Sequence, residues 1–301
     1  MIDIILTIIT FSSMLIIFKY FELFKINNLQ AIIVNYITAG FLALFADKNF
    51  SISNFSIGNV IHSEFIFQAL IIGVLFIITF NLVAFGTQKI GISITTVSNK
   101  MSMIIPVIVG LFIFNEDKNL IKLSGVILAI LAIYFSCSKN GKLSFEKKYL
   151  FIIILIFIGQ GIADSTLKWA QEISLNETNN NTFFATTFFI AALFGGVFLT
   201  YQIFKGQHTF RTKNIIWGII LGIPNYFTLF FFVEALSSGI FESSQVFPIV
   251  NMGVIVLTAT SGILLFKEHL SKSNWLGIAL AVIAISLITF AKELLQLFNV
   301  G

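Results

Sequence analysis

The chain has 301 residues, of which 57% are hydrophobic and 11% are charged, and its mean hydropathy is +0.97. A soluble domain carries about 25% charged residues, so this composition excludes a soluble globular protein. The abundance of Ile, Leu and Phe excludes a disordered chain, and continuous apolar runs exclude a barrel of short alternating strands. Because one helical crossing takes about 20 apolar residues, the length predicts an all-α membrane protein with roughly ten crossings.

The charged and sulfur-containing residues exclude several other classes. The net charge is +4, but the basic residues stand singly between the apolar runs and form no stripe for nucleic acid. Cys137 is the single cysteine, so no disulfide within the chain and no Cys-based metal site is possible. The three histidines lie far apart in the sequence. We therefore expect no metal, no cofactor and no nucleic-acid partner.

The predicted elements, in chain order, are ten transmembrane helices separated by short polar breaks. The two shortest breaks, 89–91 and 237–242, predict tight hairpins between the third and fourth helices and between the eighth and ninth. The longest break runs from Asp47 to about Phe65. The expected helices span residues 2–20, 29–46, 66–88, 92–114, 120–138, 149–171, 182–204, 214–236, 242–266 and 273–297.

The two halves of the chain repeat each other. With a shift of 152 residues, Gly125, Ala129 and Ala132 fall on Gly277, Ala281 and Ala284. Weaker matches follow in the same order along the whole chain. Because five is an odd number, two halves of five helices insert with opposite orientations, an arrangement typical of secondary transporters. We therefore predict two inverted five-helix repeats, 1–139 and 149–301, joined by a linker at 140–148.

Each half resembles an EamA domain of the drug/metabolite transporter superfamily. The pattern is a proline-containing helix, a glutamate at its end, a short loop and a last helix that begins near a glycine. It departs from symmetry because the proline stands ten residues before the glutamate in the first half and twenty before it in the second. The residues are Pro106, Glu116 and Gly125 in the first half and Pro248, Glu268 and Gly277 in the second.

The resemblance covers nearly the whole chain and implies a ten-helix carrier that exports or exchanges a small metabolite by alternating access. It implies a multi-pass protein of the bacterial inner (plasma) membrane whose partners are the solute and the lipid bilayer. The alternatives are a membrane-embedded enzyme and a non-transporting scaffold or regulator of lipid flux. The sequence contains no HExxH, GxSxG or Walker motif, so we expect no enzyme.

Lys100 is the first candidate site residue. An ionisable side chain inside a membrane helix costs about 2.5–3.5 kcal/mol on insertion scales, so a function is expected of it. Lys100 lies well inside the fourth helix, next to Asn99, and its counterpart in the second half is Asn251. A single ammonium group suits an anionic or zwitterionic solute. The alternative is that Lys100 reaches the membrane surface or forms a structural ion pair.

Asp164 is the second candidate, for proton coupling. Gln160, Asp164 and Lys168 are spaced by four residues and share one face of the sixth helix. The alternative is an internal ion pair between Asp164 and Lys168. A direct contact with Lys100 is disfavoured, because Asp164 lies about 22 Å into its helix and Lys100 only about 12 Å into a helix of the same direction.

Asn225 and Asn251 form the third group, beside prolines 224 and 248, with Gln245 as a weaker companion. Proline frees a backbone carbonyl one turn earlier, and in membranes such groups often line a cavity. The alternative is that these amides bond across helices. We expect a central cavity lined by the third, fourth, eighth and ninth helices, with the sixth contributing.

Three sets of small residues predict close helix packing, either within the chain or in a homodimer. Glu116 and Glu268 are interpreted as capping or loop residues rather than site residues. The small-residue sets are Gly125/Ala129/Ala132, Gly277/Ala281/Ala284 and Gly218/Gly222.

The orientation in the membrane is contested. The family resemblance implies that both termini are cytoplasmic, whereas cytoplasmic loops normally hold the excess of Lys and Arg. The loops on the side of the termini would hold Lys48, Lys118, Lys122, Lys168 and Lys292. The opposite side would hold Lys19, Lys25, Lys89, Lys139, Lys142, Lys147, Lys148, Lys205, Arg211, Lys213, Lys267 and Lys272, which with Lys100 complete the 18 basic residues.

Overall fold

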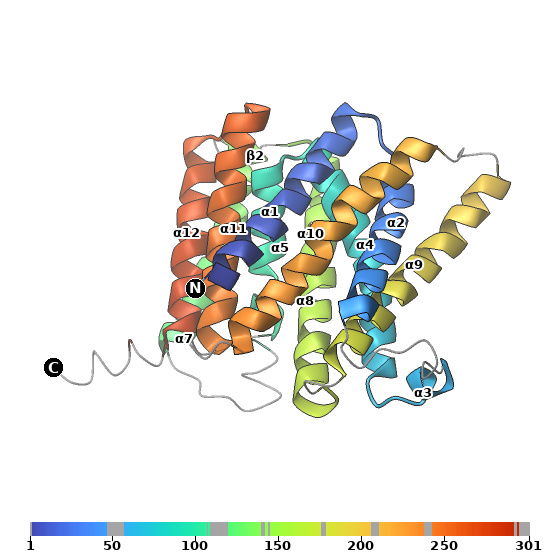
Figure 1. Ribbon diagram of the computed structural model, residues 1–301. Coiled ribbons are helices and arrows are strands. Elements are labelled where there is room, and N and C mark those ends of the chain that lie inside the picture. The colour runs from blue at the N-terminus through green and yellow to red at the C-terminus, as the bar shows by residue number, and fades with distance from the viewer. Residues whose placement is uncertain are drawn as a thin grey trace.

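The computed structural model is a bundle of helices that run up and down beside one another (Figure 1). It describes residues 2–46, 57–106, 108, 120–139, 142–143, 145–175, 179–205, 211–237, 243–291 and 294. Its helices in chain order are α1 (Ile2–Leu23), α2 (Asn28–Ala46), α3 (Ile57–Ile61), α4 (Ile66–Lys89), α5 (Ile92–Met101), α7 (Leu120–Ser136), α8 (Leu150–Ile173), α9 (Asn180–Phe204), α10 (Thr212–Ser237), α11 (Ser243–Phe266) and α12 (Lys272–Thr289).

The ten predicted helices match these elements, with α3 as an addition. The fourth predicted helix differs in being interrupted, because α5 ends at Met101 and residues 104–106 are helical again, while most of its predicted remainder up to residue 114 lies outside the described residues. Helix α12 ends at Thr289, residues 291 and 294 are again helical, and most of the predicted helix beyond residue 291 lies outside the described residues. The five-residue α3 lies inside the segment that was expected to be a loop.

The linker contains a small β-hairpin that the all-α prediction missed. Strand β1 (Ser138–Lys139) pairs antiparallel with β2 (Lys142–Leu143), and the short 3-10 helix η1 (Lys147–Tyr149) leads into α8. The sequence between the two strands is Asn-Gly, which is the strongest short signal for a hairpin. That signal was available in the sequence, but four paired residues leave the overall class unchanged.

Among the described residues, seven helices are long and apolar enough to cross a bilayer, namely α1, α2, α4, α8, α9, α10 and α11. Helices α7 and α12 are shorter apolar helices. Large apolar side chains cover the outside of the bundle, including Phe45 at 70% exposure and Val197 at 65%. An apolar outer surface of this kind fits a lipid environment, so the chain is a multi-pass membrane protein.

Helix α1 packs against α4, α10 and α11. Its inner face is closely packed, since Met14, Leu15, Phe18 and Phe21 are all buried. The rings of Phe18 and Phe21 meet edge to face at 5.7 Å, a favoured aromatic geometry. The first helix therefore joins helices of both halves of the chain.

The small-residue stripes pack helices within the chain. Helices α7 and α12 are antiparallel partners, and a Cβ atom at Gly125 would lie 3.1 Å from the carbonyl oxygen of Ala284. Gly277 faces the backbone of Ser136 in the same way. These stripes therefore pack α7 against α12 within one chain. They give no support to the homodimer, which stays a prediction.

Helix α10 approaches α2 through Gly218 and Gly222. A Cβ atom at Gly218 would lie 2.6 Å from the carbonyl oxygen of Ala31, and one at Gly222 would lie 2.8 Å from that of Asn35. Backbone atoms cannot move aside as a flexible side chain can. The close approach of the two helices therefore requires glycine at both positions.

Five connections between helices lie at one end of the bundle, which we call the upper end after its place in Figure 1. The chain turns there between α1 and α2, α4 and α5, α7 and α8, α9 and α10, and α11 and α12. The N-terminal end of α1 lies toward the opposite, lower end (Figure 1). Successive helices therefore alternate in direction, as expected for a chain that crosses a membrane repeatedly.

We predict that Gly218→Ala lowers the stability of the protein by about 1–3 kcal/mol, the usual cost of overpacking. Thermal unfolding in detergent would measure this loss. Gly196→Ala in α9 is the matched control, because a Cβ atom there meets nothing within 4 Å. Equal melting temperatures for the two variants would contradict the close α2–α10 packing.

Candidate functional site

The helix that carries Lys100 is interrupted just beyond it. At Ser102 and Met103 the backbone amides donate to the carbonyl oxygens three residues earlier, those of Asn99 and Lys100, at 3.4 Å. Residues 104–106 are helical again. Pro106 explains the change, because its ring clashes with the carbonyl group four residues earlier, that of Ser102. We call this turn the α5 break.

A chain of polar side chains connects the α5 break to α8. The Asn99 amide donates to Gln160 Oε1 at 3.3 Å, and the Gln160 amide donates to Asp164 Oδ1 at 2.8 Å. The Ser102 hydroxyl lies 3.5 Å from Asp164 Oδ2, and it also donates to the Asn99 carbonyl oxygen at 2.5 Å. We call these four residues together with Lys100 the Lys100 cluster.

The Lys100 ammonium group contacts an aromatic ring instead of the Asp164 carboxylate. Its Nζ atom lies 3.3 Å from the centroid of the Phe11 ring on α1, a cation–π contact that strengthens when it is desolvated. Lys100 and Asp164 belong to one cluster through Ser102, which lies two residues beyond Lys100 and contacts Asp164. No ion pair within 4 Å joins these two side chains, both of which the structure describes. An ammonium and a carboxylate group therefore lie near each other without being paired.

The predicted depth difference overstated the separation of Lys100 and Asp164. The register of α5 and α8 brings Asn99 beside Gln160 and Ser102 beside Asp164. Counting residues from each helix start assumes that both helices begin at the same height. Tertiary packing sets the real offset, and it places Asp164 beside Ser102, two residues or about 3 Å along the helix from Lys100. The prediction that there is no direct contact holds, but the two groups are neighbours.

Asn251 reaches the same region from α11. Its amide group lies 3.6 Å from the sulfur atom of Met103, inside the α5 break. The cluster is therefore surrounded by α1, α5, α8 and α11. These are the first, fourth, sixth and ninth transmembrane helices. The sequence predicted a cavity lined by the third, fourth, eighth and ninth helices, with the sixth contributing. Helix α1 was not among the predicted helices, and the third helix, α4, packs against both α5 and α8.

Asn225 lies at a different place. Its amide group donates to Asn35 Oδ1 at 3.0 Å, and both residues are buried between α10 and α2. The interhelical bond that we gave as the alternative for Asn225 is therefore present. The other two predicted residues, Gln245 in α11 and Lys168 in α8, have side chains that lie outside the described residues.

Glu268 caps the helix that carries Lys100. It follows α11, in the second half of the chain, and its Oε1 atom accepts the Ile92 backbone amide at 2.7 Å. Its Oε2 atom accepts the Ser93 hydroxyl at 3.1 Å. Gly91, with φ of +121°, begins α5 without a side-chain cap of its own. A carboxylate at a helix N-terminus is favourable because it satisfies free amides and faces the positive end of the helix dipole.

The prediction that Glu268 is a capping residue is thus confirmed, although the helix that it caps belongs to the other half of the chain. Gly262 makes room for it, since a Cβ atom there would lie 2.7 Å from Glu268 Oε2. Glu116, its counterpart in the first half, lies outside the described residues. The cap fixes the upper end of α5, while the Lys100 cluster lies at the other end of that helix.

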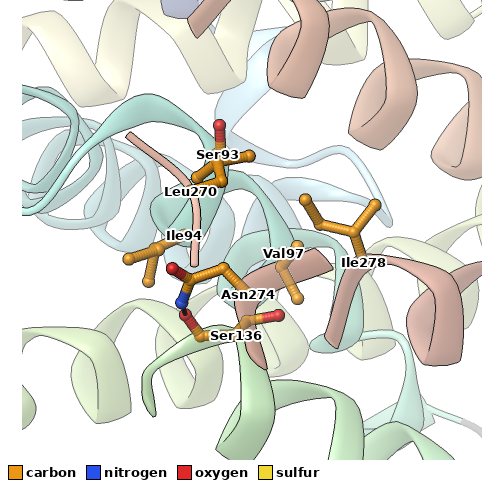
Figure 2. Close-up of a pocket in the computed structure, with 7 residues that line it drawn as sticks. All are labelled: Ser93, Ile94, Val97, Ser136, Leu270, Asn274 and Ile278. Atoms are coloured by element: carbon orange, nitrogen blue, oxygen red, sulfur yellow. Dashed lines mark hydrogen bonds between the residues drawn. The ribbon is translucent and has the colours of Figure 1, made fainter. Parts of the chain in front are cut away.

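One hollow in the described structure lies away from the Lys100 cluster (Figure 2). It contains about 140 Å³ of empty space, none of it wide enough for a water molecule. The Asn274 amide donates to the Ser136 carbonyl oxygen at 2.6 Å across its wall, as Figure 2 shows. The hollow is therefore a packing gap and is too narrow for a metabolite. Its lining residues are Ser93, Ile94, Val97, Ser136, Leu270, Asn274 and Ile278.

The sequence indicated one further member of the site, Gln160, but gave no sign of another, Phe11. Gln160 was placed on the face of Asp164 by its spacing, and its amide does link Asp164 to Asn99. Phe11 carried no usable signal, because it is one of 36 phenylalanines. Only the three-dimensional approach of α1 to α5 distinguishes it from the rest.

We predict that Glu268→Ala lowers stability by about 0.5–2 kcal/mol, as the loss of an N-terminal cap does. Gly262→Ala should reproduce part of the loss by displacing the carboxylate. Glu234→Ala, which removes an exposed carboxylate on α10, is the control and should change little. Thermal unfolding in detergent measures all three variants. A Glu268→Ala protein as stable as the control would refute the capping role.

Comparison with known proteins agrees with these observations. Residues 147–290 match the EamA-like transporter family. An uncharacterized protein of Haemophilus influenzae is 28% identical over 268 residues, which are 88% of this chain and 90% of that protein. One crystal structure has a TM-score of 0.63 and 12% sequence identity over 98% of each chain, a likeness that shows the fold alone. The chain is therefore a multi-pass integral membrane protein whose residues 147–290 match the EamA-like transporter family.

Proposed function

We propose that the protein is a secondary transporter that moves a small anionic or zwitterionic metabolite across the bacterial inner membrane by alternating access. The observation that carries the proposal is the Lys100 cluster, where Asp164 contacts Ser102, two residues beyond Lys100, while the Lys100 ammonium group lies over the Phe11 ring and forms no ion pair with Asp164. Buried charges are expensive in a membrane and normally pair or serve a function. A solute that supplies one or both complementary charges accounts for this arrangement.

Two inverted five-helix repeats are supported by the way the helices pack. Helix α1 of the first half packs against α10 and α11, and α8, its counterpart in the second half, packs against α4 and α5. In the same way α2 packs against α10, while α9 packs against α4. When each helix in these pairs is replaced by its counterpart in the other half, the resulting pair of helices is also in contact. Helices α1 and α8 also run in opposite directions (Figure 1).

The site lies between the proposed repeats, where alternating access requires it. Helices α1 and α5 come from the first half, and α8 and α11 come from the second. Transporters of this kind bind their solute near the midplane at the repeat interface, often beside interrupted helices. The α5 break supplies such an interruption. Rocking of one half against the other would then expose the Lys100 cluster to each side of the membrane in turn.

The residues have distinct roles in this proposal. Lys100 binds the acidic group of the solute after its ammonium group turns from the Phe11 ring. Asn99 and Asn251 form hydrogen bonds with the solute. Asp164 couples transport to a proton, because it can take up a proton while Gln160 keeps it in position. Asn225 and Gln245 stay predicted parts of the polar lining on α10 and α11, and Lys168 stays a predicted partner of Asp164.

The direction of transport in this proposal is export, which rests on the family resemblance. No described contact favours the membrane-enzyme or scaffold alternatives.

Lys100→Gln should abolish transport while leaving membrane insertion intact, because glutamine keeps much of the length of lysine without its charge. The measurement is uptake of a panel of organic acids and amino acids into liposomes that contain the purified protein. Lys205→Gln, which removes an exposed lysine after α9, is the matched control. Normal uptake by Lys100→Gln would refute the site assignment, and no uptake by the unchanged protein of any solute would count against the carrier.

Asp164→Asn should keep solute exchange but abolish its dependence on a proton gradient. Asparagine has the shape of aspartate and can keep the contact with Gln160, yet it cannot take up a proton at neutral pH. Solute exchange and gradient-driven accumulation, measured in the same liposomes, separate the two effects. Accumulation that persists unchanged in Asp164→Asn would exclude Asp164 as the coupling residue.

A further inference from the structure

We propose that the upper end of the bundle faces the cytoplasm and lies against the anionic lipids of the inner leaflet, so that both termini lie outside the cytoplasm. This orientation is the reverse of the one that the family resemblance implies. The inference is independent of the proposed transport function. It rests on the distribution of charge over the two ends of the folded chain.

The structure gathers twelve basic residues at the upper end. Each of these basic residues belongs to one of the five upper connections or lies within a few residues of one. Most are exposed, and several of them belong to different connections that are far apart in the sequence. The twelve are Lys19, Lys25, Lys89, Lys139, Lys142, Lys147, Lys148, Lys205, Arg211, Lys213, Lys267 and Lys272.

Few acidic residues offset these charges. The upper end has three acidic residues, Glu22, Glu146 and Glu268, so its formal charge is 12 − 3 = +9. Glu22 contacts Lys19 and Lys89, and Glu146 contacts Lys148. Glu268 is occupied as the cap of α5. The upper end therefore presents a strongly basic surface.

The rest of the chain has the opposite balance. Counted from the sequence, the residues outside the upper end, without Lys100 and Asp164, include five lysines and ten acidic residues, a formal charge of 5 − 10 = −5. Lys100 and Asp164, inside the bundle, cancel each other. The sum +9 − 5 agrees with the net charge of +4. The small net charge thus conceals a large difference between the two ends.

Two physical effects favour placing the basic end inside the cell. Short loops rich in Lys and Arg are retained in the cytoplasm during insertion, a rule that applies to loops of up to about 60 residues. All five upper connections are far shorter than this limit. The cytoplasmic leaflet also carries anionic lipid, which attracts basic residues close to a membrane surface. Both effects act in the same direction.

Cysteine labelling in intact cells tests the orientation. Cys137 is buried and is the single cysteine of the sequence, so Cys137→Ser gives a background without thiols. Thr212→Cys places a thiol at an exposed position of the upper end, and His62→Cys places one at an exposed position near the lower end. A maleimide that cannot cross the membrane should label His62→Cys in intact cells. It should label Thr212→Cys only after permeabilisation.

The reverse labelling pattern would overturn the proposal, and so would equal labelling of both cysteines in intact cells. A second measurement does not depend on thiols. Alkaline phosphatase fused after Gly301 should be active, whereas a fluorescent protein fused there should stay dark, because phosphatase folds outside the cytoplasm and the fluorescent protein inside it. A bright fluorescent fusion together with an inactive phosphatase fusion would also overturn it.

Discussion

The structure depends on one constraint, which is that lipid offers no partner for a polar group, so that the protein must satisfy its own charges and backbone amides. The α5 break shows how this is done. Pro106 disturbs the backbone bonding near Ser102, and the Ser102 hydroxyl bonds within the turn and contacts Asp164. The Lys100 ammonium group is covered by the ring of Phe11. Each polar group at the break is thus held by a neighbouring helix.

The same constraint applies at the upper end, where several polar contacts join the two halves of the chain. Glu268 caps α5 across the halves, and Asn214 at the start of α10 bonds to Asn27 and Gln30 of the first half. Lys213 donates to the Phe24 carbonyl oxygen beside them. These bonds hold the two halves together at the surface where α5 begins. In the proposed carrier they would have to break whenever the Lys100 cluster opens toward that surface.

The proposed orientation makes the upper end cytoplasmic, so the contacts that Glu268, Asn214 and Lys213 make between the halves lie on the cytoplasmic side. A basic surface there would also raise the local concentration of an anionic solute before it reaches Lys100, since a surface of one sign of charge attracts ions of the other. The basic surface that sets the orientation and the Lys100 ammonium group that binds the solute are therefore both positively charged. Charge thus links insertion to transport in this proposal.

The sequence by itself determined the class of the protein, the approximate positions of its helices and the two charged residues inside them, because apolar runs and charges within them are local properties of a membrane chain. It also indicated the cap at Glu268 and the close packing at Gly218. Only the tertiary structure decided which groups meet. The register of α5 and α8 brought Asp164 near Lys100, and the approach of α1 selected Phe11 from 36 phenylalanines. The pairing of Asn225 with Asn35 likewise depends on how α10 packs against α2, and such contacts between helices distant in sequence leave no periodic signal in the chain.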